Sequence, residues 1–159
     1  MSFSTADLHD ANEGRVHVAH PGLHDFGGRR KFSGAIATLK VHEDNSLVRE
    51  ALSEPGLGRV LVIDGGASMR CALVGDKLAE LGRASGWSGI VVSGCVRDAA
   101  TLAGIDFGIR ALGAHPARSA KKGLGERDVP VTFAGITFLP GAWLYVDEDG
   151  ILLSPIKLI

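Results

Sequence analysis

The sequence has few features of a membrane protein, a secreted protein or a nucleic-acid-binding protein. None of its hydrophobic runs approaches the length of a membrane span, and the opening residues lack the basic and apolar regions of a signal peptide. The formal net charge is only −1, so the chain lacks the basic excess that a nucleic-acid partner favours. We therefore expect a cytoplasmic protein that uses neither a membrane nor a nucleic acid as its partner.

Cysteine is equally scarce. The two cysteines, Cys71 and Cys95, do not have the close spacing of a metal-binding pair. Each lies in an apolar stretch, so we expect both to be buried free thiols in a reducing compartment. No Ser-His-Asp or Cys-His pairing stands out either, which disfavours nucleophilic catalysis.

Histidine offers another candidate metal cluster, because four of the six histidines lie within residues 9–24. These four are His9, His17, His20 and His24. The Pro21-Gly22 pair would break any helix between them, and no acidic residue is held at a rigid spacing. We expect exposed loop side chains at these positions rather than metal ligands.

Length and glycine content favour one α/β domain over residues 1–159. The chain is long enough to bury a core, and its 22 glycines predict many tight turns. Short apolar runs in the middle are typical of parallel strands buried on both faces. There we expect strands at 59–64, 69–74, 88–94 and 107–113, with helices at 75–85 and 98–104.

Other local signals extend this prediction to both ends of the chain. Ser4 or Thr5 is a candidate N-cap for a short first helix, and Asn45 for a helix over 46–54. Residues 32–42 alternate well enough for a strand. From Val129 on, short β runs separated by glycine, proline and acidic turns predict antiparallel pairing. We expect a layered α/β fold with one mainly parallel and one antiparallel sheet.

A charged pair, Arg97-Asp98, directly follows the buried strand at 88–94 and precedes helix-forming alanines. Residues 69–93 read as strand, helix and strand, which predicts a right-handed crossover with both strands in the same direction. The carboxyl ends of these strands then lie at one sheet edge, about 5 Å apart. Gly75-Asp76, at the helix start, and Arg97-Asp98 can therefore share one pocket, where ligands of open α/β sheets bind.

The residue types in this predicted pocket suit a small 2-oxo acid. Free backbone N–H groups at the helix start bind an anion, and Gly75 lets a ligand approach the backbone. Arg97 offers a fork of donors for a carboxylate or an enolate oxygen. Asp98 is a hard oxygen ligand for Mg²⁺ or Mn²⁺, whose shell water and substrate oxygens would complete.

A simpler interpretation uses the same residues. Arg97 and Asp98 would be a surface pair, with Asp98 only capping the short helix that follows it. Asp76 would be an ordinary N-cap of its own helix. Spacing alone leaves both interpretations open.

The chain resembles the RraA-like family, which includes 4-hydroxy-4-methyl-2-oxoglutarate aldolases. The shared pattern is an aspartate, twenty residues and then Arg-Asp, here Asp76 followed by Arg97-Asp98. The surrounding ALVGDKLAELGRASGWSGIVVSGCVRD, GIDFGIRALG, GERDVPVTFAGITFLPG and DEDGILLS match as well. The likeness covers roughly residues 25–154.

The resemblance implies a swivelling β/β/α domain, a ring-shaped homotrimer with pockets between subunits, and a metal-dependent class II aldolase. That enzyme cleaves 4-hydroxy-4-methyl-2-oxoglutarate into two pyruvates through a pyruvate enolate, with oxaloacetate decarboxylation as a side activity.

Carried over by position, the family pattern implies a role for each matching residue. The amides of Gly75, Asp76, Lys77 and Leu78 would hold the substrate carboxylate. Arg97 would bind the keto oxygen and stabilise the enolate. Asp98 would hold the divalent cation, and Asp76 would orient or deprotonate a water.

Two departures from the family pattern bear on the aldol reaction more than on decarboxylation. Aldolase-active relatives tend to carry an acid three places after the Arg-Asp aspartate, where this chain has Thr101. Longer aldolases also extend at the carboxyl end, whereas this sequence stops at Ile159.

The same family contains a protein of a different class. This is the regulator of ribonuclease activity A, which binds and inhibits ribonuclease E. A non-catalytic regulator is therefore the alternative function.

Overall fold

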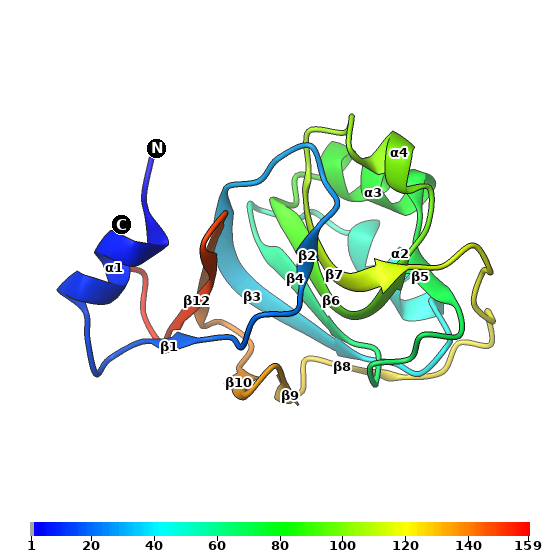
Figure 1. Ribbon diagram of the computed structural model, residues 1–159. Coiled ribbons are helices and arrows are strands. Elements are labelled where there is room, and N and C mark those ends of the chain that lie inside the picture. Colours follow the sequence, from blue (N-terminus) through cyan, green and yellow to red (C-terminus); the bar gives the residue numbers. More distant parts are fainter. Residues whose placement is uncertain (1) are drawn as a thin grey trace.

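The computed structural model describes residues 2–159 and contains four helices, twelve strands and two sheets (Figure 1). The helices are α1 (Thr5–Ala11), α2 (Ser46–Leu52), α3 (Asp76–Ala84) and α4 (Ala99–Leu102). The first six strands are β1 (His17–Val18), β2 (His24–Asp25), β3 (Phe32–Lys40), β4 (Val60–Asp64), β5 (Ala72–Val74) and β6 (Gly89–Val96). The last six are β7 (Gly108–Ala114), β8 (Glu126–Arg127), β9 (Val131–Phe133), β10 (Ile136–Phe138), β11 (Trp143–Asp147) and β12 (Gly150–Ser154).

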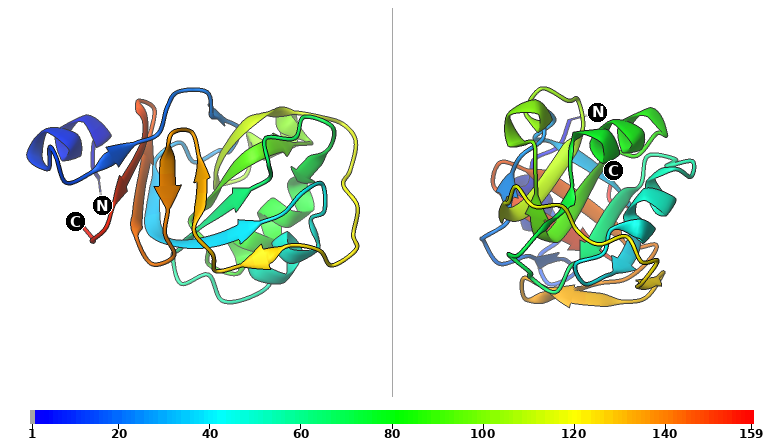
Figure 2. Two further views of the ribbon diagram at one scale, coloured as in Figure 1. Left: turned by 90° about the horizontal axis from the view of Figure 1, so that it is seen from below. Right: turned by 90° about the vertical axis from the view of Figure 1, so that its right-hand side faces the viewer.

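The large sheet has a parallel centre and antiparallel edges. Its main path is β1-β12-β11-β3-β4-β6-β7-β2, with β5 added beside β6 and β8 beside β3. The pairs β3–β4, β4–β6, β5–β6 and β6–β7 are parallel, as the sequence predicts for strands joined by helices. Figures 1 and 2 show α2, α3 and α4 grouped beside this parallel part, away from β9 and β10.

Alternating side chains of the central strands build a core on each side of the sheet. Leu61 and Ile63 of β4 pack in one core with residues of α2 and α3. Val60 and Val62 of the same strand pack in the other core with residues of β9, β10, β11 and β12. Because successive strand residues point to opposite faces, an unbroken apolar run serves both cores. The layers are therefore helix, central sheet and antiparallel β structure, which confirms the predicted α/β class.

The antiparallel part differs from the prediction in one respect. The tail strands do pair antiparallel, as β9–β10 and β11–β12, but only the first pair forms a separate sheet. The long strand β3 joins the second pair to the parallel sheet, because residues 32–35 pair with β11 and residues 36–40 pair with β4. One strand thus serves two neighbours along different parts of its length.

The amino-terminal helix packs on the antiparallel end of the large sheet. Ser4, one of the two predicted candidates, is its N-cap, and its hydroxyl accepts a hydrogen bond from the Asp7 N–H. Thr5 attaches the helix to β11 by donating its N–H and its hydroxyl to the Asp147 carboxylate, at 2.7 and 2.6 Å. Asp147 is only 5% exposed. Burial raises its pKa, but the donated hydrogen bonds lower the pKa by more, so the net pKa lies below its ordinary value.

This buried carboxylate generates a pH-dependent stability prediction. The folded-state pKa of Asp147 lies below its ordinary value. The contribution of Asp147 to the free energy of unfolding is therefore present above the unfolded-state pKa and is lost as pH falls through the folded-state pKa. Replacing Asp147 with Asn should lower the free energy of unfolding by about 1–3 kcal/mol at neutral pH, measured by urea denaturation. The difference from wild type should shrink below pH 3.8, the ordinary pKa of Asp.

The exposed neighbour offers a control, since Asp149→Asn should change stability little at any pH. If the difference in unfolding free energy between wild type and Asp147→Asn stayed constant into strong acid, the assignment of a lowered pKa to Asp147 would be wrong.

Candidate functional site

The predicted crossover from β5 through α3 to β6 is present, and it ends in two irregular ladders. β5 and β6 are parallel neighbours, with Ala72 opposite Cys95 and Val74 opposite Val96. The register shifts between Ala72 and Val74, and the β6–β7 register shifts between Val92 and Cys95. Such irregularities re-aim side chains at the end of a strand. The expected strand over 69–74 is shortened to β5, which leaves residues 69–71 outside the ladder.

A tight corner after β6 turns Asp98 back toward the crossover helix. Asp98 has φ 61° and ψ 40°, a left-handed conformation that Asp tolerates better than most residues. Its Oδ2 accepts a hydrogen bond of 3.1 Å from the Asp76 N–H at the start of α3. The Arg97 N–H donates to the Val74 carbonyl at 2.9 Å. Two hydrogen bonds therefore tie the end of β6 to the end of β5 and the start of α3.

These contacts correct the simpler interpretation of both aspartates. Asp98 occupies the N-cap position of α4, but its side chain makes no capping bond to that helix and instead caps α3. Asp76 is the first residue of α3 rather than its cap, which is Gly75. The carboxylate of Asp98 reaches α3 because the corner lies beside the end of β5, a tertiary contact that local capping rules do not include.

Gly75 makes the approach of Asp98 possible. A Cβ at this position would lie 2.7 Å from Asp98 Oδ2 and 3.0 Å from Arg97 Cγ, closer than side-chain atoms pack. Its φ of −125° is ordinary for any residue, so the need for glycine here is space and not backbone conformation. Any larger residue would displace Asp98 or Arg97.

A pocket of ≈ 350 Å³ opens at this point, and we call it the Arg97 pocket. All six site residues proposed from the sequence line it: Gly75, Asp76, Lys77, Leu78, Arg97 and Asp98. The spatial prediction that the helix start and the Arg-Asp pair share one pocket therefore agrees with the structure. No hydrogen bond or ion pair within residues 2–159 involves the Arg97 guanidinium or the Asp76 carboxylate, so both are available to a ligand.

The helix amino terminus is partly used by the protein itself. The Asp76 N–H already donates to Asp98, so it is not available to a substrate carboxylate as the family pattern implied. The N–H groups of Lys77 and Leu78 follow it in the first turn, where a helix has no internal acceptors for them. Within the first turn of α3, an anion held by backbone donors would therefore use these two groups.

Sequence reasoning missed the opposite wall of the pocket. That wall includes Asn45 at the N-cap of α2, Arg49 in the last turn of α2 and, from the loop after β7, Arg118 and Lys121. Asn45 is at the N-cap of α2, but its side chain does not cap the helix and instead donates to the Leu73 carbonyl at 3.1 Å. The basic run RSAKK at 118–122 was the available signal, but only the fold shows which surface it faces.

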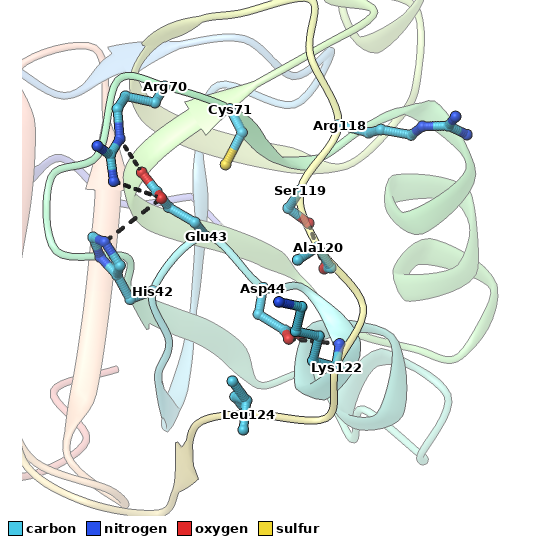
Figure 3. A pocket seen from close by; sticks show the side chains of 10 residues that line it. All are labelled: His42, Glu43, Asp44, Arg70, Cys71, Arg118, Ser119, Ala120, Lys122 and Leu124. Carbon is cyan, nitrogen blue, oxygen red and sulfur yellow. Dashed lines mark hydrogen bonds and ion pairs between the residues drawn. The ribbon is translucent and has the colours of Figure 1, made fainter.

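A second pocket of ≈ 360 Å³ shares Arg118 with the Arg97 pocket, and we call it the Glu43 pocket (Figure 3). Glu43 has a positive φ of 54°, and its carboxylate accepts from Arg70 at 2.6 and 2.7 Å and from Ser68 at 2.6 Å. The hydrogen bonds from Arg70 and then Ser68 lower the pKa of Glu43 to about 2. The carboxylate is thus ionised, and Arg70 balances its charge within the protein.

The remaining candidate groups lie away from the Arg97 pocket. His9 lies in α1, His17 in β1 and His24 in β2, and the ring of His20 lies close to Gly135. Thr101, at the position where aldolase-active relatives tend to carry an acid, is exposed on α4 and does not line the pocket.

Both cysteines are free and buried, as predicted. Burial raises the pKa of Cys71 and of Cys95. Both thiols are therefore kept in the neutral form, which is a weak nucleophile.

The acidic side chains of the pocket fit a hard divalent cation with few protein ligands. Within residues 2–159 no three His, Cys, Asp or Glu side chains lie close enough to share one metal ion. Asp98 is exposed, and only its Oδ2 is engaged, with Asp76 on the same wall. Mg²⁺ commonly uses one or two carboxylates and completes its shell with water and substrate oxygens, whereas zinc sites need three or four protein ligands.

Comparison with known proteins shows the family. A sequence profile of the RraA-like family, described as Aldolase/RraA, matches residues 5–153. A relative from Alkalilimnicola ehrlichii is 60% identical over 159 residues, covering 100% of this chain and 99% of its own. One from Laribacter hongkongensis is 58% identical and covers 100% of both chains. Each is named "Putative 4-hydroxy-4-methyl-2-oxoglutarate aldolase". The chain belongs to the RraA-like family.

Solved structures agree with this assignment. The RNA-processing inhibitor RraA from Thermus thermophilis superimposes with a TM-score of 0.96 at 45% identity, covering 100% of this chain and 96% of its own. A Geobacillus kaustophilus protein described as an S-adenosylmethionine:2-dimethylmenaquinone methyltransferase has a TM-score of 0.96 at 43% identity, covering 98% and 97%. The fold is therefore common to proteins with three different functional descriptions.

The contact between Asp98 and α3 predicts a measurable stability effect. Replacing Asp98 with Ala removes the carboxylate that caps α3 and should lower the free energy of unfolding by about 1 kcal/mol. Asn keeps an oxygen that can accept from Asp76 N–H, so Asp98→Asn should cost less than Ala. Urea denaturation of both variants measures this order, with the exposed Glu148→Ala as a control. Equal stability of the Ala variant and wild type would show that the contact is not formed in solution.

Proposed function

We propose that the protein is a divalent-metal-dependent class II aldolase that cleaves 4-hydroxy-4-methyl-2-oxoglutarate into two pyruvates. Oxaloacetate decarboxylation is the proposed side activity. The observation that carries this proposal is the Arg97 pocket, which combines an unpaired guanidinium, an exposed carboxylate and helix N–H groups. The names of relatives at 58–60% identity support the same reaction.

In this mechanism the substrate binds through its 2-oxo acid end. The N–H groups of Lys77 and Leu78 hold the carboxylate at C1, assisted by the α3 dipole. Arg97 donates hydrogen bonds to the keto oxygen at C2. Asp98 would hold Mg²⁺ or Mn²⁺, which supplies Lewis acidity toward the oxo acid when bound.

Bond cleavage then needs one proton transfer out and one back. Asp76, directly or through a water, takes the proton from the 4-hydroxyl group. The O–H electrons form the carbonyl of one pyruvate and the C3–C4 bond breaks. Its electron pair forms the C2=C3 double bond, and the π pair of the C2 carbonyl moves to the oxygen, which gives an enolate. Arg97 stabilises the charge that develops there. Return of the proton to C3 gives the second pyruvate. With oxaloacetate, loss of CO₂ leaves the same enolate.

The proposal includes a homotrimer with the pocket near a subunit interface, as the family resemblance implies. In the single chain the pocket includes the exposed side chains of Lys77, Arg118 and Lys121. A neighbouring subunit would limit the access of water to the reacting atoms.

A second candidate function is regulation of a ribonuclease. The likeness to an RNA-processing inhibitor at 45% identity over the whole chain favours it specifically. The two functions differ in their requirements, because inhibition by surface contact needs neither a cation nor the unpaired Arg97. Binding to purified ribonuclease E, with no turnover of either oxo acid, would favour this candidate over the aldolase.

Metal dependence provides the main test of the aldolase proposal. Pyruvate release from 4-hydroxy-4-methyl-2-oxoglutarate and from oxaloacetate should require Mg²⁺ or Mn²⁺ and stop with EDTA, after correction for protein-free decarboxylation. Asp98→Asn should reduce release to the EDTA level while its melting temperature stays close to that of wild type. Turnover of neither substrate at any metal concentration would refute the proposal, and wild-type turnover by Asp98→Asn would remove Asp98 from the cation site.

Arg97 provides a separate test of enolate stabilisation. Arg97→Lys keeps the positive charge but loses the fork of donors, so kcat/KM for oxaloacetate should fall roughly 100-fold. Steady-state kinetics at saturating Mg²⁺ measures the change. Arg83→Lys, on the exposed side of α3, is the matched control and should leave the kinetics unchanged. If Arg97→Lys were as active as the control, Arg97 would have no part in the reaction.

A further inference from the structure

The Arg97 pocket contains more positive charge than a pyruvate unit requires. Five cationic side chains line it, namely Arg49, Lys77, Arg97, Arg118 and Lys121. The only carboxylates in the lining are those of Asp76 and Asp98. The whole chain carries a net charge of −1, so this excess is a local property of the pocket. Such an arrangement attracts a ligand with more than one negative charge.

Arg118 and Arg49, like Arg97, have no side-chain partner within residues 2–159. Neither guanidinium makes a hydrogen bond or an ion pair with any residue in the described part of the chain. By contrast, Arg70 and Arg127 are paired with carboxylates. An arginine that lines a pocket without a partner is free to bind an external anion, with the bidentate geometry that suits a carboxylate.

The backbone places Arg118 beside β5, a short distance from the catalytic end of the pocket. Arg118 pairs with Ala72 in a parallel bridge, and the Ala72 N–H donates to the Ala117 carbonyl at 2.7 Å. Ala72 precedes Gly75 by three residues, which is about 10 Å of extended chain. Figure 3 shows the Arg118 side chain directed away from the Glu43–Arg70 pair. Arg118 therefore lies at the outer end of the pocket and Arg97 at the inner end.

The loop that carries Arg118 has little regular structure, and a buried carboxylate is one of its attachments beside the backbone hydrogen bonds of Ala117 and Ala120. Asp44 is 2% exposed, and it accepts hydrogen bonds from the Ser46 N–H at 2.9 Å and from the Lys122 N–H at 2.6 Å. Although burial raises the pKa of Asp44, the donated hydrogen bonds lower it below the ordinary value. Asp44 is thus ionised at neutral pH and ties the loop to the start of α2. The parallel bridge between Asp44 and Ala120 adds to this attachment.

We propose that Arg118, assisted by Arg49, forms a second carboxylate subsite that selects dicarboxylic over monocarboxylic 2-oxo acids, and that Asp44 is the positioning residue that holds Arg118 there. This inference rests on the proposed function, because it assumes that the inner end of the pocket binds the 2-oxo acid group. The distal carboxylate of the substrate is the natural occupant of the outer subsite, since it is the second anion of such a ligand.

A pair of matched ligands separates the two ends of the pocket. 2-Oxoglutarate and 2-oxopentanoate have the same carbon chain, and only the first has a distal carboxylate. Isothermal titration calorimetry with Mg²⁺ should give a dissociation constant about tenfold or more lower for 2-oxoglutarate in the wild-type protein. Arg118→Gln should weaken 2-oxoglutarate about tenfold and leave 2-oxopentanoate unchanged. Arg49→Gln should act in the same direction, with a smaller effect.

Kinetics of oxaloacetate decarboxylation provides the second measurement. Arg118→Gln should raise KM about tenfold and should not lower kcat, because the distal carboxylate loses its charge as CO₂ leaves and is bound no more tightly in the transition state than in the substrate. Arg15→Gln removes the same charge from an exposed arginine outside the pocket and should have no effect. Equal weakening of both ligands by Arg118→Gln, or no weakening of either, would overturn the subsite.

The role of Asp44 is tested by a double-mutant cycle. The Asp44→Asn side chain presents to the Lys122 N–H either an amide NH₂ group, which cannot accept a hydrogen bond, or a neutral oxygen, which is a weaker acceptor than a carboxylate. The loop is then held less firmly, and the preference for 2-oxoglutarate should fall. In the Arg118→Gln background, Asp44→Asn should change that preference no further, whereas a general loss of stability would weaken both ligands in either background. An additive effect on the preference would refute the positioning role.

The outcomes for the subsite and for the proposed reaction are distinguishable. Normal turnover with an Arg118→Gln variant that behaves like wild type refutes the subsite and leaves the aldolase intact. Absent turnover with a retained preference for 2-oxoglutarate that depends on Arg118 refutes the reaction and supports the subsite. Failure of the wild-type protein to bind either ligand at millimolar concentration refutes both.

Discussion

The candidate site depends on one hydrogen bond, from the Asp76 N–H to the Asp98 carboxylate. It joins the start of α3 to the corner that follows β6, and it fixes both the aspartate and the arginine beside it. The space for this contact comes from the missing side chain of Gly75. A left-handed Asp98 is an uncommon conformation, and it lies here at the wall of a pocket, which is where strained backbone often has a function.

The electrostatics of the pocket follow from the same arrangement. One wall comes from the crossover, and the other from α2 and the loop after β7. Each wall contributes cations that have no partner in the described part of the chain, whereas the charge of Glu43 in the adjoining pocket is balanced by Arg70. The fold itself does not choose between the functional descriptions of its relatives, because one scaffold can carry different sites. The unpaired arginines and the exposed aspartate favour small anionic ligands.

Several parts of the structure follow from local sequence patterns, and others do not. The buried strands β4 and β6 were predictable because their continuous apolar runs suit strands covered on both faces. The cap of the first helix was predictable to within one residue, Ser4 or Thr5, because both residue types favour the N-cap position. Asn45 was expected to cap α2, but the Leu73 carbonyl, distant in sequence, accepts its amide instead. The union of two predicted sheets through β3 has the same origin, since strand partners are chosen by tertiary contacts.

The sequence alone therefore determined the α/β class, the crossover and the inner end of the pocket, because periodicity, turn residues and the direction of parallel strands are local or topological properties. Only the tertiary structure decided that Asp98 caps α3, that Asp44 holds the loop carrying Arg118, and that β11 and β12 join the parallel sheet. The reason is physical: each of these contacts joins segments far apart in the chain, and their partners are selected by packing and by the hydrogen-bonding needs of buried groups.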